Sequence, residues 1–362
     1  MNNQQFSVIP DTSNYWLKNA HVPVCRIESE LDISSQTREG LSLVDIEIKE
    51  GVIKQIVQSN GELPSLNNGD IPRVDLKGAM VWPCFVDMHT HLDKGHIWER
   101  SPNLDGSFNG ALDAGARDGE KYWNAEDIYR RMEFGLKCSY AHGTKAIRTH
   151  IDCFGEQANI SLEVFQTLQK QWEDRLILQP VSLVGGDYYL TQAGEKLANQ
   201  VADVGGILGG VPFMSSDVDN QLDRLFSLAK ERQLDLDLHT DENGDPNSRV
   251  LHKVAEKAIS YQFPGKIICG HCCSLAVQTP EKVIETLKLV KEAGISIVSL
   301  PMCNLYLQNR QDNYTPRWRG VTLLHELKQQ GISVAIASDN CRDPFFGSVS
   351  YTHLRAHETC GH

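Results

Sequence analysis

From residue 80 onward, short apolar runs alternate with longer amphipathic segments. The runs occupy residues 80–89, 145–152, 176–184, 205–213, 234–241, 266–271, 295–300 and 332–339. Segments such as 221–233, 248–262 and 280–294 repeat apolar residues at helical spacing. Strands that alternate with helices at intervals of about thirty residues predict βαβ units and a parallel sheet. This α/β pattern favours a (β/α)8 TIM barrel, because an open doubly wound sheet would carry a glycine-rich fingerprint after its first strand.

The N-terminal part differs from this pattern. Residues 41–58 alternate apolar and polar side chains around Gly51, which predicts a β-hairpin. We therefore expect a small β-subdomain over residues 1–80 and the barrel over residues 81–347.

The first crossover of the predicted barrel is unusually long. Residues 96–124 are rich in glycine, aspartate and asparagine, and a helix is expected only from residue 125. Long irregular loops in compact domains are usually functional or disordered. This one follows the end of the first strand, on the face where barrel active sites form, so we expect an irregular flap over the substrate.

Composition narrows the range of partners. The chain has 362 residues, 41% of them hydrophobic, and acidic residues outnumber basic ones by 47 to 35. Without a basic stripe, nucleic acid and anionic membranes are poor partners. Ten scattered cysteines favour a reducing compartment, and no signal peptide or membrane-spanning run is evident. We expect a cytoplasmic protein, with a homo-oligomer left open.

Imidazole and carboxylate side chains stand where the apolar runs end. His89 and His91 close the first run, and side chains two apart in a strand face the same way. The others are His150, His239, His271 and Asp339, with Glu242 three residues beyond His239. In a barrel these positions meet at one mouth.

Three imidazoles and one carboxylate form a donor set that suits Zn²⁺ or Fe²⁺ and leaves a position for water. Such an ion lowers the pKa of water toward neutrality, and a nearby carboxylate and imidazole can move protons. A histidine taken alone is more often a core or loop residue, and for His150 both interpretations stay open.

Six segments carry a family resemblance. FVDMHTHLDK, IRTHID, LDLHTDE, GHCCSLA, NLYLQNRQDNYTPRWRG and SDNCRDPF resemble the amidohydrolase superfamily and, within it, the cytosine deaminase branch, over about residues 80–347. The resemblance implies that one divalent ion, Zn²⁺ or Fe²⁺, is held by His89, His91, His239 and Asp339. It also implies that Glu242 shuttles protons and that His271 positions the hydrolytic water, with Asp339 part of the catalytic group.

The resemblance fails at two positions that concern the substrate. Gly185 stands where cytosine deaminases carry a glutamine that reads the pyrimidine edge, and Asn340 stands where they carry a second acid. We therefore expect a flat neutral ring to be recognised by Gln308 or Asn340 and covered by aromatic side chains. The candidates for covering the ring are Trp98, Phe108 and Phe345.

Three further titratable residues follow the histidine pair closely. His96 is not expected to be a ligand, since a further imidazole would close the position for water. Asp93 and Lys94 either orient the ligands or form a surface pair at the strand exit.

The leading functional hypothesis is metal-dependent deamination of cytosine to uracil and ammonia. The alternatives are deamination of isocytosine, a triazine or creatinine, and hydrolysis of a cyclic amide by an enzyme of the dihydroorotase or hydantoinase type. The latter enzymes commonly use two metals and a bridging lysine, and no lysine stands in the third or fourth apolar run. A barrel that only binds a small molecule, without catalysing a reaction, would be expected to lack some of the metal-ligating residues. In this sequence every one of those positions is filled.

The last segment, residues 348–362, contains His353 and His357 beside Glu358 and so imitates a helical metal motif. It lacks the apolar face of a closing helix, and it resembles a translated sequencing adapter. We expect a non-native tail on a chain that is truncated near residue 348.

Overall fold

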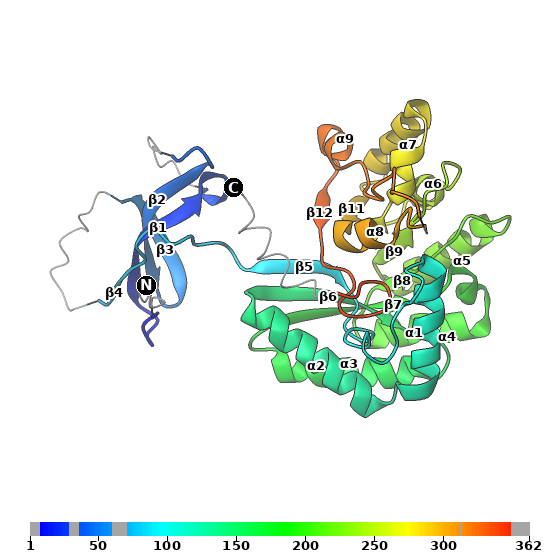
Figure 1. Ribbon diagram of the computed structural model, residues 1–362, viewed down its shortest axis with the longest axis horizontal. Coiled ribbons are helices and arrows are strands. Elements are labelled where there is room, and N and C mark those ends of the chain that lie inside the picture. The colour runs from blue at the N-terminus through cyan, green and yellow to red at the C-terminus, as the bar shows by residue number, and fades with distance from the viewer. Residues whose placement is uncertain (1–7, 29–35, 60–70, 312, 349–362) are drawn as a thin grey trace. The chain divides into compact units, whose positions relative to one another are not determined.

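The computed structural model describes residues 8–28, 36–59, 71–311 and 313–348 (Figure 1). The chain divides into two compact units, Met1–Cys84 and Phe85–His362. The expected non-native tail, with His353 and His357, lies beyond residue 348 and so outside the described residues.

The first unit is built on a four-stranded sheet in the order β3-β2-β1-β4. Its strands are β1 (Tyr15–Pro23), β2 (Leu41–Lys49), β3 (Val52–Gln58) and β4 (Arg73–Asp75), with a short 3-10 turn at Val24–Arg26. β2 and β3 pair antiparallel around Gly51, whose φ of +77° suits glycine, so the predicted hairpin is present. A small core forms from Ala20, Val22, Val44, Ile46 and Leu76.

The second unit contains eight strands that pair in parallel. They are β5 (Phe85–Thr90), β6 (Thr144–Asp152), β7 (Ile177–Leu183), β8 (Leu208–Gly210), β9 (Leu236–Thr240), β10 (Ile267–His271), β11 (Ser296–Ser299) and β12 (Val334–Ile336). β5 to β7 and β8 to β12 each form a continuous sheet. Isolated parallel bridges join the two sheets at both edges: Val181 to Ile207 and Gly185 to Val211 at one edge, and Thr90 to Asp339 at the other. The predicted (β/α)8 barrel is confirmed.

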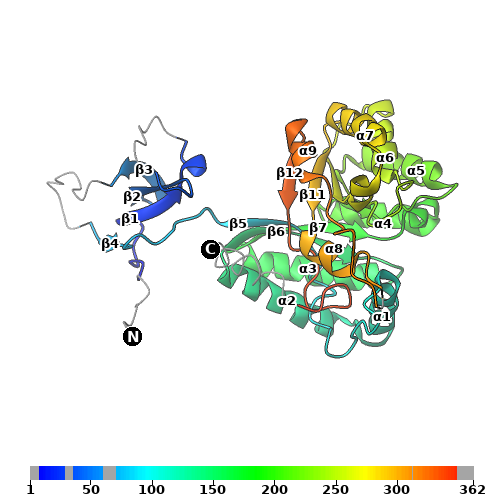
Figure 2. The ribbon, with the colours of Figure 1, turned by 45° about the horizontal axis from the view of Figure 1, so that its top comes forward.

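Helices alternate with these strands. They are α1 (Phe108–Tyr122), α2 (Ala125–Ala141), α3 (Gln157–Trp172), α4 (Gln192–Asp203), α5 (Val218–Arg232), α6 (Val250–Ser260), α7 (Pro280–Glu292), α8 (Pro301–Leu307) and α9 (Leu324–Gln329), with 3-10 turns at Gly186–Leu190 and Cys273–Val277. In Figures 1 and 2, α2 and α3 lie along the outer side of β6 and β7. Every residue of β9 and β10 is buried, as expected for parallel strands covered on both faces.

The long first crossover is not the irregular flap that we expected, because it contains α1. Ser107 caps this helix by accepting a hydrogen bond from the Gly110 amide at 2.9 Å. The helix buries Ala111, Ala114 and Asp118. Glycines at 110, 115 and 119 lower its intrinsic helix propensity, which hides it in the sequence.

Within the described residues, no helix has the length and apolar character needed to cross a membrane.

Candidate active site

A left-handed residue with a polar side chain stands at or shortly after the carboxyl end of three barrel strands. Asp241, His271 and Asp339 have φ values of +52°, +66° and +64°. Aspartate and histidine tolerate this conformation better than bulky or β-branched residues do. The chain therefore turns sharply at the carboxyl ends of β9, β10 and β12.

Four predicted residues bring their donor atoms close together, with His239 and Asp339 each beside the His89–His91 pair. Nε2 of His239 lies 3.2 Å from Nε2 of His89 and 3.4 Å from Nε2 of His91. Oδ1 of Asp339 lies 3.2 Å from Nε2 of His91 and 3.6 Å from Nε2 of His89. All four side chains are buried. The structure thus gathers three imidazoles and one carboxylate from the ends of β5, β9 and β12.

This donor set fits a divalent cation. A tetrahedral site with bonds of about 2.0–2.1 Å places neighbouring donors roughly 3.3 Å apart, and the four separations lie between 3.2 and 3.6 Å. Burial lowers the pKa of His89 and His239 well below the usual value, so these rings are neutral. Among the described residues, neither oxygen of Asp339 has a hydrogen-bond partner. A buried carboxylate without partners is costly unless a cation balances it, and Zn²⁺ or Fe²⁺ accepts this set.

A second polar group lies beside the first. Oε1 of Glu242 is 3.2 Å from Nδ1 of His271, and the side-chain amide of Asn304 donates to these two atoms at 3.0 Å and 3.1 Å. Burial, with the Asp339 carboxylate adding to it, raises the pKa of Glu242 well above the usual value. Burial lowers the pKa of His271 to about 4. Such a group can hold and move a proton.

Asn304 was missed by sequence reasoning. It lies on α8 after the seventh barrel strand, inside the NLYLQ segment of one matching motif. Only the fold places its amide against Glu242 and His271.

His150 joins the histidine cluster from β6. Its ring lies against the ring of His89, with centroids 3.9 Å apart, and its Nε2 lies 3.7 Å from Oδ1 of Asp237. Neither ring nitrogen has a hydrogen-bond partner in the described part of the chain. Burial lowers the pKa of His150 well below the usual value, so it packs as a neutral ring.

Asp93 and Lys94 are not a surface pair. Asp93 is fully buried and accepts a hydrogen bond from the Asp152 amide at 2.7 Å, while Nζ of Lys94 lies 2.8 Å from Oδ1 of Asp152. Both residues therefore tie the segment after His91 to the end of β6. His96 packs its ring on Phe134, at 4.8 Å between centroids, and belongs to no potential metal-donor group in the described ranges.

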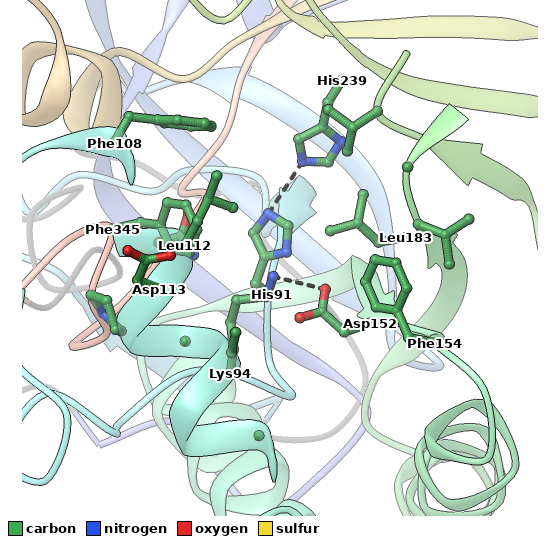
Figure 3. Close-up of a pocket in the computed structure, with 18 of the residues that line it drawn as sticks. His91, Lys94, Phe108, Leu112, Asp113, Asp152, Phe154, Leu183, His239 and Phe345 are labelled. Atoms are coloured by element: carbon green, nitrogen blue, oxygen red, sulfur yellow. Dashed lines mark hydrogen bonds and ion pairs between the residues drawn. The ribbon is translucent and has the colours of Figure 1, made fainter. Parts of the chain in front are cut away.

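A cavity of about 720 Å³ adjoins both polar groups (Figure 3). His91, His239, Glu242, His271 and Asp339 form one wall. The apolar lining includes Phe108 and Leu112 of α1, Phe154, Phe213 and Phe345. In Figure 3, Phe108 and Phe345 lie on one side of His91, and Phe154 and Leu183 lie on the other. Lys94 reaches the cavity, but its ion pair with Asp152 offsets its charge. The space suits a flat organic molecule of low charge.

Of the residues predicted to contact substrate, some line the cavity and others do not. Phe108, Phe345 and Asn340 line the cavity, and the two phenylalanine rings meet edge to face at 5.9 Å. The amide of Asn340 donates to Asp343 at 2.7 Å, which fixes its orientation.

Trp98 and Gln308 were also expected to contact the substrate. This prediction is corrected, because neither is among the described residues that line the cavity. The Trp98 ring lies beside Gly347, where an added Cβ would stand 3.1 Å from it. Gln308 donates to the main-chain oxygen of Glu242 at 3.1 Å, so its amide is turned to the protein.

The barrel and the histidine–carboxylate cluster at its mouth are what a metal-dependent hydrolase requires, and the comparisons with known proteins identify the protein as one that acts on carbon–nitrogen bonds. The chain belongs to the amidohydrolase family, whose model matches residues 133–357. It is 47% identical over 338 residues to a pterin deaminase from Rhizobium rhizogenes (strain K84 / ATCC BAA-868), covering 93% of this chain and 76% of that protein.

One further relative and one solved structure are similar to this chain. An N-isopropylammelide isopropyl amidohydrolase from Pseudomonas sp. (strain ADP) is 30% identical over 278 residues, which cover 75% of this chain and 65% of that protein. The solved structure of 5-methylcytosine deaminase from Klebsiella pneumoniae, liganded with 5-fluorocytosine, superposes with a TM-score of 0.78 at 24% identity. That match covers 94% of this chain and 78% of that one, and it supports the fold.

Proposed function

We propose that this protein is a metal-dependent deaminase whose substrate is a bicyclic amino-heterocycle of the pterin class. The observation that carries the reaction is the pair of adjoining groups, a four-donor cluster and a Glu242–His271 pair, on one wall of the cavity. The substrate class is supported by the 47% identity to a pterin deaminase.

The cavity volume also favours a bicyclic ring over a single one. Ligand sites commonly enclose about 300–1,000 Å³, and this cavity of about 720 Å³ lies in the upper half of that range. A single pyrimidine ring would leave much of it unfilled. A fused ring offers more surface than a single ring for contact with Phe108 and Phe345, which line the same cavity as the histidine cluster.

His89, His91, His239 and Asp339 would hold the ion, as expected from the sequence. When bound, a divalent ion lowers the pKa of water and supplies a hydroxide nucleophile at neutral pH.

Glu242 and His271 account for the proton movements. The Glu242 carboxylate takes one proton from the water and passes it to the ring nitrogen next to the attacked carbon. His271 donates a hydrogen bond to the oxygen that adds. A second proton, from the added hydroxyl group, moves to the exocyclic amine; the carbon–nitrogen bond breaks and ammonia leaves. Water and the amino-heterocycle thus give a ring carbonyl and ammonia.

Cytosine remains the second candidate substrate. The motifs at the site resemble the cytosine deaminase branch, and a solved 5-methylcytosine deaminase shares the fold. Against it stand Gly185, which lines the cavity without an edge-reading side chain, and the unfilled volume.

The test is ammonia release by the zinc-loaded protein from pterin, cytosine, isocytosine, a triazine and creatinine, with dihydroorotate as the cyclic-amide control. We expect kcat/KM for pterin to exceed that for cytosine by at least tenfold. A preference for cytosine would move the protein to that branch. Ring opening of dihydroorotate without ammonia release from any amine would refute the deaminase proposal itself.

A further inference from the structure

The helical turn at the end of α8 places two amides against Glu242. Nδ2 of Asn304 donates to Oε1 of Glu242 at 3.0 Å, and Nε2 of Gln308 donates to the main-chain oxygen of Glu242 at 3.1 Å. Asn304 and Gln308 are four residues apart and are joined by a backbone hydrogen bond of 3.0 Å, so their side chains lie on one face. Both the side chain and the main chain of Glu242 are therefore held.

The same amide determines where His271 carries its proton. Nδ2 of Asn304 lies 3.1 Å from Nδ1 of His271, and an amide nitrogen only donates. Nδ1 must therefore accept, which puts the ring hydrogen on Nε2. That Nε2 atom is buried without a hydrogen-bond partner among the described residues, and His271 lines the cavity.

The position of Asn304 also separates two groups that would otherwise share a proton. Oε1 of Glu242 and Nδ1 of His271 are only 3.2 Å apart. Without a donor between them, the ring would protonate at Nδ1 and donate to the carboxylate. Nε2 would then face the cavity as an acceptor and could no longer donate to substrate or nucleophile.

The packing around α8 is tight enough to hold this arrangement. Asn304 is 1% exposed. Gly320 packs against the end of the helix with φ of +73°, and an added Cβ there would lie 2.5 Å from Cβ of Gln308 and 2.8 Å from the main-chain oxygen of Asn304. The segment after α8 thus presses on the turn that carries both amides.

We propose that Asn304 is the positioning residue of this site. It keeps the Glu242 carboxylate as an acceptor and fixes His271 as the Nε2–H tautomer, while Gln308 holds the main chain of Glu242. This inference rests on the proposed function for the role of Glu242 in proton transfer, but the tautomer can be measured without turnover.

The experiment compares Asn304→Leu and Asn304→Asp in the zinc-loaded protein. Both replacements keep the shape of the side chain and remove its donors. We expect kcat to fall on the order of 10–100-fold, with KM and metal content nearly unchanged and the Asp variant at least as impaired as the Leu variant. Asn199→Leu, an exposed position on α4, whose residues do not line the cavity, should leave kcat unchanged. A purely space-filling role predicts near-normal kcat in both Asn304 variants.

Nitrogen NMR of histidine-labelled protein supplies the second measurement, with the His271 signals assigned from a His271→Gln sample. The wild-type ring should show the Nε2–H tautomer, and Asn304→Leu should shift it toward Nδ1–H. An unchanged tautomer, a kcat within twofold of wild type, or a rise in KM alone would overturn the proposal. If the wild type deaminates no substrate of the panel, the proposed function fails, while the NMR result still decides the role of Asn304.

Discussion

Asp241 and Asp339 are buried carboxylates that each follow a barrel strand in a left-handed backbone conformation, but their surroundings are opposite. Asp241 accepts hydrogen bonds from the Ser248 hydroxyl at 2.6 Å and from the amides of Val250 and Leu251 at 2.9 Å each. Asp339 has no hydrogen-bond partner for either oxygen among the described residues.

We propose that this difference separates a structural acid, Asp241, from a metal-ligand acid, Asp339. Asp241 satisfies free amides in the first turn of α6, which also stabilises its charge near the positive end of the helix dipole. Asp339 lies among imidazole side chains instead, and a bound cation would offset the desolvation of its carboxylate. Burial and position at a strand end do not distinguish the two acids. Hydrogen-bond satisfaction does.

The largest effect is expected from Asp339→Asn, with Asp241→Asn as its matched control. Asparagine keeps the shape and tolerates the left-handed backbone, so the pair isolates charge and acceptor capacity. We expect Asp339→Asn to lose most of its metal and on the order of 10³-fold in kcat/KM. Asp241→Asn should keep its metal. Metal analysis after dialysis and ammonia release measure both.

Two results would contradict this division. One is full metal content with activity within tenfold of wild type in Asp339→Asn. The other is equal metal loss in the two variants, which would mean that any buried acid at the barrel mouth supports the site through folding alone.

The next largest effect is expected from Glu242→Gln. The amide keeps the shape of the side chain but cannot take a proton from water, so kcat should fall about 10²–10⁴-fold. Because Glu242 is outside the four-donor cluster, metal content should match that of wild type. Single-turnover kinetics and metal analysis test this, and a near-normal kcat would remove Glu242 from the proton path.

A smaller effect is expected on stability from Asp241→Asn. One of its new amide hydrogens would face a backbone N–H of α6, leaving a buried donor unsatisfied. The loss should be about 1–3 kcal/mol in the free energy of unfolding. Denaturant unfolding measures it, with Asn199→Leu on the exposed side of α4 as a surface-helix control. No loss would show that water or rearrangement satisfies these amides.

Much of the barrel and of the cluster could be predicted because the signals are local. Apolar runs mark the strands, and His89, His91, His239 and Asp339 stand at the ends of those runs. Barrel geometry then brings strand ends together whatever their separation along the chain.

The rest depends on contacts that no local pattern records. Helix α1 is rich in glycine and is stabilised by its cap and buried face rather than by propensity. Asn304 and Gln308 donate hydrogen bonds to Glu242 only because α8 packs beside the loop after β9. Trp98 was expected at the substrate because it is aromatic and close to the histidine pair, yet its ring packs beside Gly347.

The smallest effect concerns a third buried acid, Asp118 on α1, which extends the comparison to a fully satisfied carboxylate. It accepts hydrogen bonds from Arg100, Ser101 and Trp123 at 2.7–2.8 Å. Burial alone would raise the pKa of Asp118, but these donors hold it below the usual value of 3.8. An acid with a lowered folded-state pKa stabilises the fold above its unfolded pKa and loses that contribution as pH falls through the folded value.

The stabilisation by Asp118 should therefore be complete above about pH 5 and decline below about pH 4. We expect Asp118→Asn to lower Tm at pH 6 and to differ less from wild type at pH 3. Thermal unfolding of both proteins across this range measures the difference. A gap that stays constant with pH would show that the asparagine costs packing rather than charge, because only an ionised carboxylate gives a contribution that protonation removes.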